Sequence, residues 1–376
     1  MVEFETLSEP QREIVNLRSD RSYVIQGGAG TGKTVIALHR AKKMSVEGLK
    51  TVILVHNVPL KNYIDAEIAR MEIENCIVRT FNQWVYRICK VSGFEPPTGK
   101  SKYDYDYEKI IALFEENRIS VPDDCLGNVI IDESQDFPPL LLRFIRLVAD
   151  TVTCLIDPNQ SIHNTDTSLV DALYEIDVES ARTLDVNFRS TCESAAVARI
   201  FWNESGIYPA SFRHGQKPVM VSCGDDSDRT RRIAEIAAKY NFKNDNVSIG
   251  VFVNGIDEGK KMYDALSDEL GRRYIQYRFS KDDDKKADSD PTKIDFAKPG
   301  VKLFTYGMIK GLDFDAIVVG DNISRAGIED DAYINMLYMT LTRATSDIYI
   351  CYKDADDDGN YFLQKLKENR GLCEWR

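Results

Sequence analysis

Short apolar runs alternate along the chain with longer segments in which apolar residues recur every three or four positions. The nearly uninterrupted runs Thr51–Val55 and Val152–Ile156 are typical of parallel strands that are buried on both faces. The amphipathic segments between such runs are typical of helices that cover a sheet. The pattern therefore predicts an α/β fold in which parallel sheets are flanked by helices.

The first half of the chain contains five such strand-like runs. They lie at Tyr23–Ile25, Thr51–Val55, Cys76–Phe81, Val129–Ile131 and Val152–Ile156. A weaker region at 86–127 contains two consecutive prolines and one helical pattern, Tyr107–Asn117. We expect this region to be a small insertion in an otherwise regular alternation of strands and helices.

The second half repeats the alternation. Strand-like runs occur at Thr183–Val186, Pro218–Cys223, Val247–Val253, Tyr274–Phe279, Val301–Tyr306, Ala316–Gly320 and Asp347–Tyr352. Helical patterns occur at Glu193–Trp202, Asp228–Tyr240, Glu258–Leu270, Ala332–Ala344 and Tyr361–Asn369. The stretch at about 281–298 begins with a dense run of charges and reads as a linker. We therefore predict two domains, 1–180 and 181–376.

A glycine-rich stretch stands between the first strand and the first long helix. It matches the pattern G-x-x-x-x-G-K-[ST], whose glycines let backbone N–H groups surround a phosphate chain. The alternative is a plain glycine-rich turn, but the flanking strand and helix favour a phosphate loop. ATP and Mg²⁺ are thus the expected ligands, with Lys33 on the β- and γ-phosphates and Thr34 on the metal. The residues of the loop are Gly27, Gly28, Ala29, Gly30, Thr31, Gly32, Lys33 and Thr34.

Two carboxylates follow the buried run Val129–Ile131. A phosphate loop requires a second metal contact and a group that orients the attacking water. Asp132 is the candidate for the Mg²⁺ shell, and Glu133 is the candidate for polarising the water. The alternative is a solvated loop after a strand, which the phosphate loop elsewhere in the chain makes less favourable.

Charge and composition narrow the class of protein. The net charge is −12, so any nucleic-acid surface must be a local patch. The first residues show no secretory signal, and no apolar run approaches the roughly 18 residues of a membrane span. The eight cysteines are scattered, without a C-x-x-C pair. We therefore expect a protein of the reduced cytoplasm without a membrane segment.

Six ordered motifs resemble those of superfamily 1 helicases of the UvrD/Rep type, and the resemblance covers nearly the whole chain. It implies two RecA-like domains that bind ATP between them. The motifs are Gly27–Thr34, Asp132–Asp136, Asp157–Ile162, Asn187–Ser190, Lys310–Phe314 and Leu341–Ala344.

The resemblance also implies nucleotide contacts. Gln11 resembles the residue that reads the adenine edge, and Phe188 resembles the aromatic residue that stacks on adenine, where tyrosine is more usual. Gly311 and Asp313 belong to the motif with the ribose contact. Asp313 stands where the family usually has glutamate, and its shorter side chain is expected to weaken that contact.

Further roles implied by the resemblance concern catalysis. Gln160 resembles the γ-phosphate sensor, and Gln135 resembles the group that couples the two domains. Arg189 and Arg343 resemble paired arginine fingers of the second domain. Outside these motifs, either arginine would more simply be explained as a surface salt bridge.

Some positions that face nucleic acid in the family depart from its pattern. At 163–168 the expected aromatic residue and arginine are missing, and Gly307 replaces a histidine. The candidate contacts with a nucleic-acid strand are His56, Asn57, Thr80, Phe81 and Trp84. For Phe81 and Trp84, packing in the hydrophobic core is an equally good explanation. The second large insertion of the family would fall between Phe279 and Val301. Roughly 20 residues fit there, fewer than the about 50 that a domain requires.

We therefore expect an ATP-hydrolysing helicase-like motor that acts on single-stranded nucleic acid, with DNA as the first expectation and RNA left open by the sequence. The alternative is an ATP-gated switch or ATPase subunit that drives a protein partner, such as a nuclease or a defence effector, with little unwinding of its own. A metabolic kinase is more distant, because it would not need Arg189 and Arg343.

Overall fold

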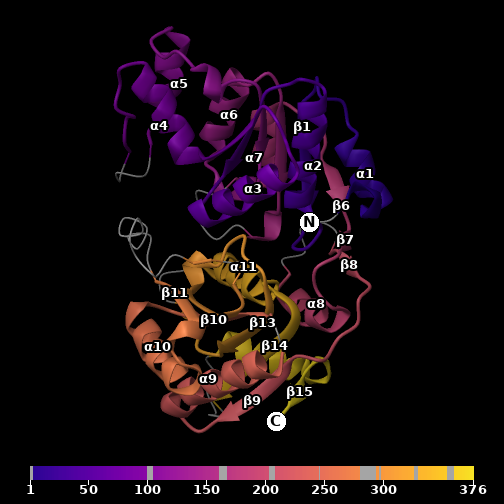
Figure 1. Ribbon diagram of the computed structural model, residues 1–376, viewed down its shortest axis with the longest axis vertical. Helices are drawn as coiled ribbons and strands as arrows, with labels where there is room; N and C mark the ends of the chain where they lie inside the picture. Colours follow the sequence, from indigo (N-terminus) through magenta and orange to yellow (C-terminus); the bar gives the residue numbers. More distant parts are fainter. Residues whose placement is uncertain are drawn as a thin grey trace. The chain divides into compact units, whose positions relative to one another are not determined.

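The chain forms two compact units, Met1–Val186 and Asn187–Arg376, each with its own parallel sheet. The boundary predicted from the sequence, between 180 and 181, lies six residues earlier. The computed structural model describes residues 3–99, 105–160, 167–202, 208–244, 246–279, 294–295, 298–325, 329–353 and 360–376. The predicted α/β class, with helices flanking parallel sheets, is confirmed for both units (Figure 1).

The first unit is built on a six-stranded parallel sheet in the order β3-β2-β4-β5-β1-β6. The central strands pair in register, for example Val24 with Cys154 and Ile53 with Ile130. All five residues of β2 and of β5 are buried, as expected of strands covered on both faces. The strands are β1 (Tyr23–Gly27), β2 (Thr51–Val55), β3 (Cys76–Thr80), β4 (Asn128–Ile131), β5 (Val152–Ile156) and β6 (Arg182–Leu184).

Helices cover both faces of this sheet. Because side chains alternate along a strand, Ile53 and Val55 of β2 contribute to one core and Val52 and Leu54 to the other. The first core includes residues of α1 (Glu9–Val15), α2 (Lys33–Val46) and α3 (Val58–Arg70). The second core includes residues of α4 (Phe81–Val91), α5 (Tyr107–Glu115), α6 (Pro139–Val148) and α7 (Leu169–Ile176).

The region expected to be a small insertion, 86–127, contributes residues such as Ile88 and Ile110 to the same core as strands β2 and β4, next to the first turn of α4. Helix α4 begins at Phe81, immediately after β3, and its Trp84 is completely buried. The indole N–H of Trp84 donates a hydrogen bond to the carbonyl oxygen of Cys125 at 3.2 Å. Trp84 is therefore a core residue, which is one of the two explanations that the sequence left open.

Strand β6 belongs to the first sheet, although the strand-like run at this position was assigned to the second half. It pairs with β1 in parallel, from Ile25 with Arg182 to Gly27 with Leu184. The amide of Gln26 also donates to the hydroxyl of Thr183 at 2.8 Å. Sequence periodicity cannot show this, because it reports that a strand forms but not which sheet the strand joins.

The second unit contains a seven-stranded parallel sheet in the order β11-β12-β10-β13-β14-β9-β15. A separate two-stranded sheet joins β7 to β8. The two-residue strands β8 and β15 were not predicted, because two residues are too few to show a period. The strands are β7 (Val186–Asn187), β8 (Ala210–Ser211), β9 (Val219–Cys223), β10 (Ser248–Val253), β11 (Ile275–Arg278), β12 (Gly300–Thr305), β13 (Phe314–Gly320), β14 (Ala344–Lys353) and β15 (Glu374–Trp375).

The helices of the second unit pack in two groups. α9 (Asp226–Lys243) and α10 (Ile256–Leu270) share a hydrophobic core with strands of the large sheet. The other helices are α8 (Cys192–Ala198), α11 (Asp330–Leu341) and α12 (Tyr361–Glu368). Aromatic contacts tie the turn after α8 to α12, through Phe201 and Phe362, and to α11, through Trp202 and Tyr338.

Most of the predicted linker at 281–298 lies outside the described residues, as do 163–166 and the Ser161–Ile162 end of one motif. Among the helices of the described segments, none is both long and apolar enough to cross a membrane.

Ending the first unit before β6 should weaken it. A fragment of residues 1–180 loses the β1–β6 ladder and Leu184, which is 3% exposed. Because deleting a buried leucine side chain typically costs 2–5 kcal/mol, we expect its free energy of unfolding to be about 2–4 kcal/mol lower than that of residues 1–186. Urea denaturation followed by circular dichroism measures the difference. The longer fragment carrying Leu184→Ala separates the side chain from the ladder, and equal stability of 1–180 and 1–186 would contradict the role of β6.

Candidate nucleotide-binding site

The glycine-rich loop leaves β1 at Gly27 and enters α2 at Lys33. Gly30 and Gly32 have φ angles of 78° and 88°, in the left-handed region that other residues rarely adopt. A Cβ atom at Gly32 would also lie only 2.6 Å from the side-chain nitrogen of Gln11. Both the backbone conformation and the close approach of Gln11 therefore require glycine at this position.

The Lys33 side chain folds back over the loop and is 6% exposed. Its ammonium group donates to the carbonyl oxygens of Gly27, at 2.8 Å, and Gly28, at 3.2 Å. The carboxylate of Asp157 lies 3.7 Å from the same nitrogen. Lys33 is thus a buried cation at the centre of the loop, where a phosphate chain would require one.

Thr34 and Asp132, the two predicted metal ligands, are in direct contact. The hydroxyl of Thr34 donates to Asp132 Oδ2 at 2.6 Å. Asp132 is completely buried after β4, and burial raises its pKa to about 6. A hydroxyl and a carboxylate oxygen are the donors that Mg²⁺ prefers, so this pair fits a magnesium ion.

Glu133 adopts the left-handed conformation, with φ 54° and ψ 47°. Its carboxylate accepts a hydrogen bond from Nε2 of Gln135 at 2.7 Å. The same Gln135 amide accepts a hydrogen bond from the backbone N–H of Asp157 at 3.0 Å through Oε1. Gln135 therefore connects the carboxylate after β4 to the turn after β5.

Gln160 lies in that turn and is 2% exposed. Its Nε2 donates to Asp157 Oδ2 at 2.6 Å, while the backbone N–H of Asn159 donates to Asp157 Oδ1 at 3.1 Å. Asp157 is completely buried, and burial raises its pKa. Asp157 received no role from the sequence. Its position was nonetheless a signal, since it follows a buried strand as Asp132 does.

Gln11 is held from both sides. Its Nε2 donates to the Thr31 carbonyl oxygen at 3.0 Å, and its Oε1 accepts from the backbone N–H of Ser8 at 3.0 Å. The Ser8 hydroxyl accepts from the Gln11 backbone N–H, which completes a capping box at the start of α1. The structure thus fixes Gln11 against the loop, and the adenine contact stays a prediction.

In the second unit, the structure brings together Arg189 and Asp313, whose closest side-chain atoms are 2.8 Å apart. Phe188, the residue expected to stack on adenine, is 51% exposed. Gly311 has a φ angle of 74°, so the turn before Asp313 requires the left-handed conformation.

Arg343 differs from Arg189 in its surroundings. It is 1% exposed, and its guanidinium donates to the carbonyl oxygens of Met339, at 3.1 Å, and Leu312, at 3.3 Å. These hydrogen bonds stabilise the backbone of its own unit. Its role as an arginine finger stays a prediction.

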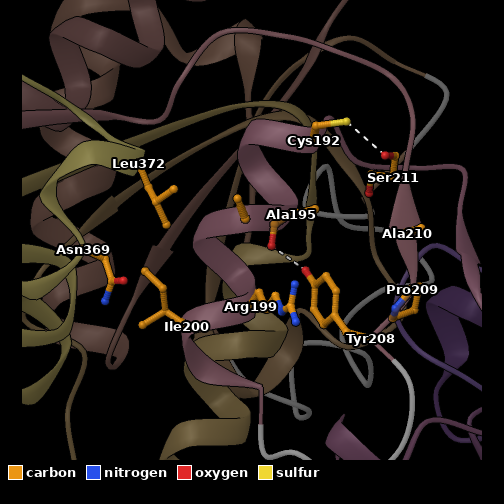
Figure 2. A pocket seen from close by; sticks show the side chains of 11 residues that line it. Cys192, Ala195, Arg199, Ile200, Tyr208, Pro209, Ala210, Ser211, Asn369 and Leu372 are labelled. Carbon is orange, nitrogen blue, oxygen red and sulfur yellow. Dashed lines mark hydrogen bonds between the residues drawn. The ribbon is translucent and has the colours of Figure 1, made fainter.

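A cavity of about 590 Å³ lies in the second unit, between α8, the segment around β8 and the turn after α12 (Figure 2). The guanidinium of Arg199 lies 5.4 Å from the ring of Tyr208, and the Tyr208 hydroxyl donates to the Ala195 carbonyl oxygen. None of the predicted site residues lines this cavity, so the cavity is separate from the predicted nucleotide-binding residues.

The groups around the loop fit a Mg²⁺–nucleoside triphosphate. The loop supplies backbone N–H groups and the cation of Lys33, Thr34 and Asp132 supply metal ligands, and Glu133 supplies a carboxylate held by Gln135. The motifs that carry these groups were recognised in the sequence. The neighbouring parallel strands β4, β5 and β1 bring the groups together at their carboxyl ends.

Comparisons with known proteins find a helicase-domain family model that matches part of the chain and solved structures with a similar fold. A family model for the DNA/RNA helicase domain of Schlafen group 3 matches residues 20–202. Comparison with curated protein sequences gives no match. The structure of the DUF1998 helicase MrfA bound to DNA and AMPPNP aligns with a TM-score of 0.55 and 12% identity, over 96% of this chain and 50% of that one.

Two other helicase structures also align. One is arterivirus nonstructural protein 10, a helicase in complex with DNA, with a TM-score of 0.44, 12% identity, and 96% and 65% of the two chains covered. The other is the C-terminal domain of a possible DNA helicase from Lactobacillus, with values of 0.36 and 17%, and 50% and 99% covered. The chain thus spans about half the length of MrfA, and its fold is that of RecA-like helicase domains.

Asp132→Asn should stabilise the protein in a pH-dependent way. The pKa of Asp132 is raised from an ordinary value of 3.8 to about 6, so the folded state binds a proton more readily than the unfolded state. Ionising the buried Asp132 therefore lowers the free energy of unfolding. This loss is absent below pH 3.8, grows as pH rises towards 6 and then stays constant, at ~3 kcal/mol. Denaturation at several pH values, with EDTA and without nucleotide, measures it. The exposed Asp150→Asn is the control, and an equal gain at pH 4 and pH 7 would contradict the expectation.

Proposed function

We propose that the protein is an ATPase of the helicase type that uses Mg²⁺–ATP and acts on single-stranded nucleic acid, DNA rather than RNA. The observation that carries this proposal is the arrangement in the first unit. A buried lysine lies over a glycine-rich loop, while a Thr34–Asp132 pair and an oriented Glu133 lie after the neighbouring strands. These are the parts that nucleotide hydrolysis needs in one place.

Each side chain has a definite task in this proposal. Lys33 neutralises phosphate charge and gives up its contacts with the loop carbonyls. Thr34 and Asp132 hold the metal ion, which balances charge on the phosphate chain. Glu133 accepts a hydrogen bond from the attacking water, and Gln135 keeps its carboxylate in place. Gln160 is the proposed γ-phosphate sensor, and its amide donates a hydrogen bond to Asp157, whose carboxylate lies 3.7 Å from Lys33.

The nucleic-acid part of the proposal is supported by the fold and by the family model that covers 20–202. A protein-driven switch is the alternative, with a nuclease or defence effector as the partner. The sequence at 163–168, which lacks the aromatic residue and arginine of the family, favours that alternative. Nucleic-acid dependence of the ATPase activity separates the two.

Glu133→Gln should separate chemistry from binding. Glutamine keeps the shape of the side chain but is a poor proton acceptor, so hydrolysis should fall at least about a hundredfold while ATP still binds. Phosphate release measures turnover, and binding of a fluorescent ATP analogue measures affinity. A variant with normal turnover, or one whose only defect is affinity, would show that Glu133 is not the catalytic carboxylate.

The activity of the parent chain should be stimulated by single strands. We expect ATP turnover to rise at least about fivefold with single-stranded DNA and to fall as salt increases, since phosphate contacts are screened. Lys33→Ala, which removes the buried cation, is the control and should reduce turnover to background in a folded protein. Turnover that is unchanged by DNA and by RNA would refute the nucleic-acid motor and favour the protein-driven switch.

A further inference from the structure

The predicted ribose contact and one predicted arginine finger form an ion pair within the second unit. Asp313 Oδ2 lies 2.8 Å from Nη2 of Arg189, and the two side chains are 39% and 24% exposed. A ribose contact would need the Asp313 carboxylate to face the nucleotide. In the structure, its partner is instead the arginine that the same reaction is expected to use.

The backbone on both sides of Arg189 is already fixed. The side chain of Asn187 accepts hydrogen bonds from the N–H groups of Arg189, at 2.9 Å, and Ser190, at 3.1 Å. The carbonyl oxygen of Arg189 accepts a hydrogen bond from Arg213 at 2.6 Å. The freedom that remains is that of the long arginine side chain, and the ion pair with Asp313 restricts it.

Asp313 is itself held by its neighbours in the chain. Arg343 donates from its guanidinium to the carbonyl oxygen of Leu312 and accepts at its own carbonyl from the N–H of Phe314. These two hydrogen bonds flank Asp313, and β13 begins immediately after it. The carboxylate therefore projects from a backbone segment that is fixed before any ligand arrives.

We propose that Asp313 is a positioning residue that orients the Arg189 guanidinium for phosphate chemistry. This inference rests on the proposed ATPase function. An arginine that is already ordered loses less conformational freedom when it reaches the developing charge of the reaction. Asp313 thus acts through Arg189, and its effect belongs to the rate of hydrolysis rather than to the affinity for ribose.

The test measures kcat and KM for ATP and for 3′-deoxy-ATP in the parent, Asp313→Ala, Arg189→Ala and the double variant. We expect Asp313→Ala to lower kcat about tenfold, to change KM less than twofold and to keep the parent's ratio between the two nucleotides. In the Arg189→Ala background it should have no further effect, because the residue that it orients is gone. Asp313→Glu, which restores the charge, should recover part of the rate.

Glu374→Ala is the matched control, since it removes the acid of a comparable pair with Arg376 elsewhere in the same unit. Four outcomes would overturn the inference. A raised KM with a lost preference for the 3′-hydroxyl would identify a ribose contact. An increased kcat would show that Asp313 withholds Arg189. An unchanged kcat would exclude a positioning role in a working enzyme. A parent chain without any ATP turnover would overturn both this inference and the proposed function.

Discussion

The site depends on burying charged groups at one end of a parallel sheet. Lys33, Asp132 and Asp157 are at most 6% exposed, and an isolated buried charge is costly unless another group compensates it. Here the compensation comes from neighbours on different strands, because β4, β5 and β1 are adjacent and end at the same edge. The strand order thus determines which charged side chains lie close enough to compensate one another when they are buried.

Much of this arrangement could be predicted from the sequence. Buried runs indicated the parallel strands, and the glycine-rich pattern indicated the loop, because each depends on neighbouring residues only. The predicted pair of Thr34 and Asp132 required only that the two strands lie close together, and the structure places the side chains 2.6 Å apart. The pairing of β6 with β1 could not be predicted, since strand order is a property of tertiary packing.

The contacts between side chains were harder to predict from the sequence than the fold. No pattern of spacing shows that Gln135 links Glu133 to the backbone of Asp157, because the direction of an amide depends on donors from another strand. The ion pair of Arg189 and Asp313 could not be predicted for the same reason, because its two residues lie far apart in the sequence. The family resemblance implied a role in coupling the two domains for Gln135 and nucleotide contacts for Arg189 and Asp313, whereas the structure shows what these residues contact within their own units.

The buried position of Trp84 has a spectroscopic consequence. The chain contains three tryptophans, at 84, 202 and 375, so Trp84 is the indole of the first unit and the other two belong to the second. The indole of Trp84 extends from α4 into the core, where its ring lies 5.7 Å from that of Phe144, without exposure to water. Its emission should therefore be blue-shifted in the folded state and shift to the red when the first unit opens. With Trp202 and Trp375 replaced by phenylalanine, tryptophan fluorescence excited selectively over that of the tyrosines would report on the first unit alone.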